Sequence, residues 1–169
     1  MTVEQAQTIH QLPPQFRPTI IVIVGDTGRA IYDQAARLFA GLDETLRTGV
    51  VTLECVTTDT MRRLPLVIDG SGAAAPPTSS QPGGDAEVDV ATAIHTAIRD
   101  VQSFHELEKI KDAGYRIPTP RTQVVIVSSA NDPSLPAVTE QVCDALRGWP
   151  EAIGAYVNFE TLVTYVLTA

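Results

Sequence analysis

The chain has 169 residues, of which 44% are hydrophobic and 19% are charged. This balance, with a mean hydropathy of +0.06, excludes a disordered chain and supplies enough apolar material for the core of one domain. The net charge of −8 argues against nucleic acids and anionic membranes as partners.

The sequence also gives expectations about the compartment. Cys55 and Cys143 are the only cysteines, too few for a zinc ribbon or a disulfide framework. The longest apolar run, Ile20 to Val24, is far shorter than the ~20 residues that a membrane-spanning helix needs. The start of the chain lacks the basic and apolar regions of a secretory signal. We therefore expect a cytoplasmic protein.

The first third of the chain reads as a polar arm followed by a strand–helix–strand unit. Residues 1–18 are polar and contain three prolines. Residues 19–24 carry consecutive β-branched side chains, which is typical of a strand covered on both faces, and predict a strand at about 19–25. Apolar residues at helical spacing predict an amphipathic helix at 29–46, and residues 50–59 predict a second strand. Parallel pairing of these strands through a right-handed crossover is expected.

The middle of the chain contains a low-complexity segment followed by two helices. Residues 64–69 predict a short strand or an edge segment. Residues 70–84, GSGAAAPPTSSQPGG, supply no apolar face and predict a flexible loop. Helices are predicted at about 87–103 and at 104–113, the second of them ending at Gly114.

The last third begins with another apolar strand, at 122–129. Asn131 or Asp132 is suited to cap the helix that follows, and Pro133 is suited to its first turn.

Gly148 and Pro150 are expected to end that helix, and residues 152–168 predict one long strand or a hairpin. The alternation of strands and helices predicts a single α/β domain over 19–169. Its expected form is a three-layer α/β/α sandwich with a mostly parallel, Rossmann-like sheet. Phe39 and Ile94 are expected in its core.

Ligands of such sheets bind at the carboxyl ends of the strands. Three segments are expected to meet there: Gly25–Arg29, Thr57–Asp59 and Ser128–Asp132.

The first segment has two interpretations. Gly25, Thr27 and Gly28 let a backbone approach a phosphate at the start of a helix, and Arg29 adds a cation. Asp26 would instead repel a phosphate, and no lysine follows as it does in the common phosphate-loop motif. The alternative is a tight turn between strand and helix, capped by Asp26 or Thr27.

The other two segments offer oxygen ligands. Asp59 could accept hydrogen bonds from a ribose or bind a cation, or it could cap a turn. Asn131 could contact a cofactor, whereas Asp26 and Asp132 are weak candidates for a metal site. One hypothesis is an enzyme whose site is formed by Asp26, Asp59 and Asp132 around Mg²⁺.

Other reactive side chains show no catalytic pattern. His95 and His105 lie on predicted helices without a second metal ligand at a suitable spacing, and we interpret them as solvated residues. No serine of the 70–84 segment has a histidine or aspartate placed near it by the sequence, so a catalytic triad is unsupported and no catalytic residue is assigned.

The stretch TIIVIVGDTGRAIYDQAARLF, followed by VVTLECVTTD, resembles the opening of bacterial tubulin-like (FtsZ-like) proteins. In this resemblance Gly25, Thr27 and Gly28 match the first phosphate loop, and Asp59 matches a residue near the ribose. The resemblance implies GTP, with Mg²⁺, as the cofactor. The later stretch TQVVIVSSANDPSLPAVTEQVCDALR is similar to the region of the second phosphate loop, but ANDPSLP stands where the family has GGGTGSG.

A second resemblance is to von Willebrand factor A-like domains, which also have an apolar first strand ending in aspartate. Their metal motif, D-x-S-x-S, corresponds here to Asp26 through Ala30, and both serines are missing. This resemblance implies a protein-binding domain with a degenerate metal site.

The sequence therefore leaves three functions open. The first is a non-catalytic interaction or assembly module of tubulin-like type, with no cofactor and with a protein or a second copy as partner. The second is a GTP-binding protein that uses Gly25–Arg29. The third is the von Willebrand factor A-like protein-binding domain.

Overall fold

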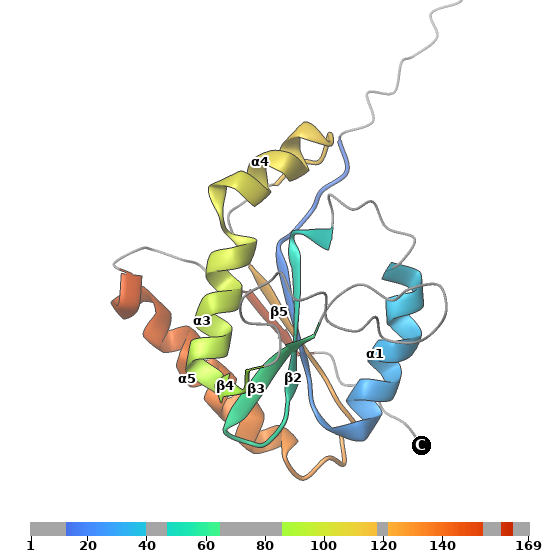
Figure 1. Ribbon diagram of the computed structural model, residues 1–169, viewed down its shortest axis with the longest axis vertical. Coiled ribbons are helices and arrows are strands. Elements are labelled where there is room, and N and C mark those ends of the chain that lie inside the picture. Colours follow the sequence, from blue (N-terminus) through green and yellow to red (C-terminus); the bar gives the residue numbers. More distant parts are fainter. Residues whose placement is uncertain (1–12, 40–46, 65–85, 118–121, 154–159, 164–169) are drawn as a thin grey trace, which may run out of the picture.

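The computed structural model describes residues 13–39, 47–64, 86–117, 122–153 and 160–163. Strands and helices alternate along these segments (Figure 1). In chain order, the elements are β1 (Thr19–Ile23), α1 (Gly25–Phe39), β2 (Val50–Cys55), β3 (Thr60–Leu64), β4 (Val88–Asp89), α3 (Val90–Val101), α4 (Phe104–Asp112), β5 (Gln123–Val127), α5 (Leu135–Ile153) and β6 (Glu160–Val163).

The strands form one mixed, mostly parallel sheet in the order β4-β3-β2-β1-β5-β6. The central strand β1 pairs in parallel with β2 on one side and with β5 on the other, and β5 pairs in parallel with β6. In the register, Ile21 lies between Thr52 and Val125. Only β3 and β4 run antiparallel to their neighbours. The parallel arrangement that the sequence predicts for the first, second and fifth strands is confirmed.

Helices cover both faces of the sheet, with α1 on one side and α3 and α5 on the other (Figure 1). The main core lies between the sheet and the pair α3–α5, and it includes Ile20, Val22, Ile94 and Trp149. A smaller cluster around Ile23 and Tyr32 lies under α1. The predicted three-layer α/β/α sandwich is confirmed, as is the burial of Ile94, whose side chain is 0% exposed.

Residues 13–18 of the predicted arm contact the loop after α4. The backbone N–H of Phe16 donates to the carbonyl of Arg116, and the N–H of Arg116 donates to the carbonyl of Pro14. The Phe16 ring lies edge-on against Tyr115, with 6.4 Å between ring centroids. This part of the arm is therefore attached to the domain by backbone pairing and by an aromatic contact.

Two expected helix boundaries are wrong. Helix α1 begins at Gly25 and not at residue 29, so the glycine segment is its first turn and not a separate loop. Helix α5 continues through Gly148 and Pro150 to Ile153. Trp149, between these two residues, is only 2% exposed, and burial of its large side chain in the core favours continuation of the helix against their low helix propensity.

Several expectations fall outside the described residues. These are the loop at 70–84, most of the segment at 64–69 and the side chain of Phe39. Of the predicted C-terminal strand or hairpin at 152–168, the described residues contain the four-residue strand β6, whereas residues 152 and 153 belong to α5 and not to a strand. None of the described helices combines the length and the apolar character that crossing a membrane requires.

Candidate functional site at the carboxyl edge of the sheet

The parallel strands β1, β2 and β5 all end at the same edge of the sheet, which we call the carboxyl edge. The segments Gly25–Arg29, Thr57–Asp59 and Ser128–Asp132 follow these strands directly, as the sequence predicts. The edge is therefore built from the first turn of α1, the turn between β2 and β3, and the connection from β5 to α5.

Both glycines of the first segment have structural reasons to be glycine. Gly25 has a φ of 70°, a left-handed conformation that L side chains rarely adopt. A β-carbon added to Gly28 would lie 2.4 Å from the carbonyl oxygen of Val127, so a side chain there would collide with the backbone of β5. Asp26 lies exposed in the first turn of α1, where a negative charge interacts favourably with the helix dipole. Thr27 is half-buried.

A carboxylate of the chain itself occupies the space above Gly25. A β-carbon on Gly25 would lie 1.8 Å from Oδ2 of Asp132. The other oxygen, Oδ1, accepts a hydrogen bond from the backbone N–H of Ser134 at 2.9 Å and another from the Ser134 hydroxyl. Asp132 thus anchors the start of α5 while its second oxygen lies against the start of α1. The carboxylate therefore lies beside the first turn of α1, and a helix N-terminus is where phosphate loops hold their anion.

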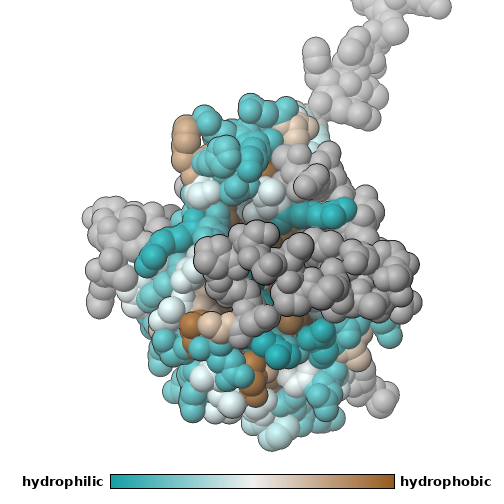
Figure 2. Space-filling model, in the orientation of Figure 1, coloured by the Kyte–Doolittle hydropathy of each residue, from teal (hydrophilic) through white to brown (hydrophobic). Residues whose placement is uncertain are grey.

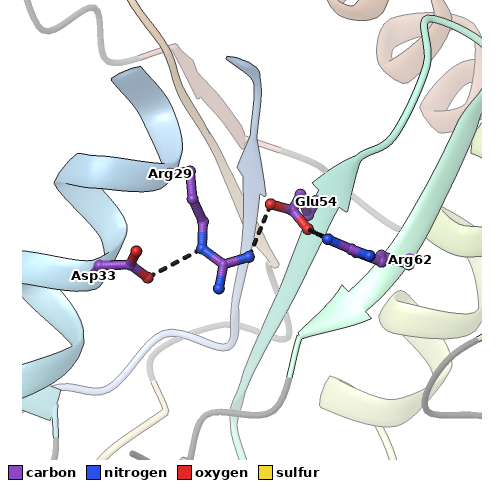
Figure 3. Close-up of polar contacts among 4 residues, drawn as sticks. All are labelled: Arg29, Asp33, Glu54 and Arg62. Atoms are coloured by element: carbon purple, nitrogen blue, oxygen red, sulfur yellow. Dashed lines mark hydrogen bonds and ion pairs between the residues drawn. The ribbon is translucent and has the colours of Figure 1, made fainter. Parts of the chain in front are cut away.

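Arg29, the cation expected to contact a phosphate, is bound to carboxylates of the chain (Figure 3). Its Nη1 donates to Oε1 of Glu54 at 2.8 Å, and its Nε donates to Oδ1 of Asp33 at 3.0 Å. Arg62 of β3 donates to the other oxygen of Glu54, from Nε at 2.7 Å. We call these four residues, Arg29, Asp33, Glu54 and Arg62, the arginine–glutamate network.

The network favours the charged forms of Glu54 and Arg29. Burial acts to raise the pKa of Glu54, but hydrogen bonds and charges of Arg29 and Arg62 outweigh it and hold that pKa below its ordinary value. The hydrogen bond to Glu54 likewise raises the pKa of Arg29. With two arginines, one glutamate and one aspartate, the network is formally neutral, and it offers no excess positive charge to a phosphate.

The second segment forms a hydrogen-bonded turn. The hydroxyl of Thr57 accepts from the backbone N–H groups of Asp59 and Thr60, at 3.2 and 3.1 Å. Oδ1 of Asp59 accepts from Nε2 of Gln141 on α5 at 2.6 Å. Asp59 therefore links the turn to α5, and the side chain that accepts from the backbone of the turn is that of Thr57, not that of Asp59 as one interpretation of the sequence expects.

The acidic residues of the carboxyl edge do not form a metal centre. In the part of the chain that the structure describes, no three acidic, histidine or cysteine side chains come together as metal ligands would. Asp26, Asp59 and Asp132 are therefore not brought together as the Mg²⁺ hypothesis expects, and Asp59 and Asp132 accept hydrogen bonds from Gln141 and Ser134. Asn131 is exposed, and its backbone N–H donates to the Ser129 hydroxyl.

His95 and Cys55 are two further residues whose side chains could react, and both are held by their surroundings in the domain. His95 is not solvated as expected: its Nε2 lies 2.8 Å from the carbonyl oxygen of Ala145, and its ring contacts Trp149. His95 therefore joins α3 to α5. Burial raises the pKa of Cys55 to about 12, with smaller contributions from Glu54 and Asp132, so its thiol is a poor nucleophile at neutral pH.

The sequence contains weak signals for two contacts of the carboxyl edge that the sequence analysis does not predict, those of Arg29 and of Glu54. Arg29 and Asp33 are four residues apart, the spacing of a helical ion pair. Glu54 is the only charged residue of its strand, which indicates a partner for its carboxylate. Nothing in the sequence indicates that Asp132 lies against Gly25, because the two residues are 107 positions apart.

No protein-family model, curated protein or solved structure matches the chain.

Proposed function

We propose that the chain is a non-catalytic α/β interaction or assembly module whose carboxyl edge contacts a protein partner or a second copy. The observation that carries this proposal is the carboxylate of Asp132 above Gly25. A phosphate at Gly25 would have to displace this carboxylate or lie beside it, and like charges at such short distances repel strongly.

The surroundings of Asp132 support the same conclusion. The only cation of the first segment, Arg29, is already shared between Glu54 and Asp33. Tubulin-like and von Willebrand factor A-like types both remain compatible with a binding module. The first would have lost its phosphate loop and the second its metal site.

The carboxyl edge has the composition of a contact surface. Val56, 39% exposed, is one of two large hydrophobic residues that the described surface exposes, the other being Phe104 on α4. Asp26, Asp59 and Asn131 are exposed in the segments of the same edge. An apolar side chain in acidic and polar surroundings suits a basic protein surface.

A thermal-shift measurement with GTP, ATP and NAD, each with Mg²⁺, tests the proposal against the nucleotide-binding alternative. A ligand at 100 times its dissociation constant stabilises the folded state by about 2.7 kcal/mol, so binding would raise the melting temperature visibly. We expect no shift with any of the three. A saturable shift with one nucleotide that Arg29→Ala removes and Arg147→Ala retains would overturn the proposal. Arg147 is an exposed arginine on α5.

Sedimentation velocity over a concentration series tests assembly. If the partner is a second copy, the sedimentation coefficient rises with concentration. Val56→Asp at the carboxyl edge abolishes this rise, whereas Phe104→Asp on α4 does not. Assembly that depends on Phe104 and not on Val56 would place the contact elsewhere and contradict the proposed edge.

A further inference from the structure

We draw no further inference here: the strongest candidate, the groove of about 680 Å³ between α3 and the strands β2 and β3, carries nothing, because its charged side chains, such as Glu106, are already paired within the chain, its apolar floor of Leu53 and Met61 is almost completely buried, and the mainly hydrophilic described surface in Figure 2 gives no indication of what covers it.

Discussion

Glu54 of β2 accepts hydrogen bonds from Arg29 of α1 and from Arg62 of β3, so this one side chain connects three elements. Its side chain is 14% exposed, so solvent screens these contacts less than at an open surface. We expect Glu54→Gln to destabilise the fold by about 1–3 kcal/mol, the range for charged hydrogen bonds and partly buried charges left without a partner. Urea unfolding at neutral pH measures this loss.

The same residue predicts part of the acid sensitivity. Because folding lowers the pKa of Glu54 from its ordinary value of 4.5, its contribution is complete above that pH and is lost as the pH falls through the folded pKa. The stabilities of the wild type and Glu54→Gln should therefore converge in acid. Glu140→Gln, an exposed control on α5, should follow the wild type. A constant difference between wild type and Glu54→Gln down to the acid transition would refute this explanation.

Among the elements, α3 contributes most clearly to the core. Ile94 is fully buried in it, between the sheet and α5. Truncation to alanine leaves a cavity, and we expect Ile94→Ala to lower the free energy of unfolding by about 2–5 kcal/mol. Thr96→Ala, two residues along on an exposed position, should change it by less than about 0.5 kcal/mol. Similar effects of both changes in urea unfolding would mean that the faces of α3 are assigned wrongly.

Periodicity predicts the elements well where local pattern and tertiary packing agree. The β-branched run from Ile20 to Val24 identifies the central strand, since only a strand buried on both faces needs such a run. The end of α5 was predicted wrongly because Gly148 and Pro150 are local helix breakers, whereas the burial of Trp149 is a tertiary effect. The start of α1 was predicted wrongly because two glycines look like a loop until the backbone of β5 is known to lie against Gly28.

At the scale of the whole molecule, the sequence places the candidate site but not its contacts. Parallel strands bring their carboxyl ends together by topology, so the edge follows from the order of the elements. Whether Asp132 binds a ligand or fills the space above Gly25 depends on the packing of two loops distant in sequence. The pairing of Asp59 with Gln141 depends in the same way on how α5 crosses the sheet.

The isolated chain is expected not to hydrolyse GTP or ATP. Phosphoryl transfer depends on groups that neutralise the phosphates, on a held metal ion and on a positioned water. At the carboxyl edge the carboxylate of Asp132 lies against Gly25, Arg29 is paired with Glu54 and Asp33, and the described acidic residues do not cluster as metal ligands. A phosphate-release assay with Mg²⁺ should show only background. The protein concentration is varied in this assay, so that a site shared between two copies would also be detected.

The variant that tests the carboxyl edge in this assay must not disturb the fold. Gly28→Val is unsuitable, because its side chain would collide with Val127 and a loss of activity would report misfolding. Arg29→Ala removes the only cation of the segment without filling space, and Arg147→Ala removes an exposed arginine elsewhere. Phosphate release that rises with protein concentration, disappears in Arg29→Ala and persists in Arg147→Ala would establish a catalytic edge. Release that is equal in all three proteins would instead indicate a contaminating hydrolase, since the substitution at the edge leaves it unchanged.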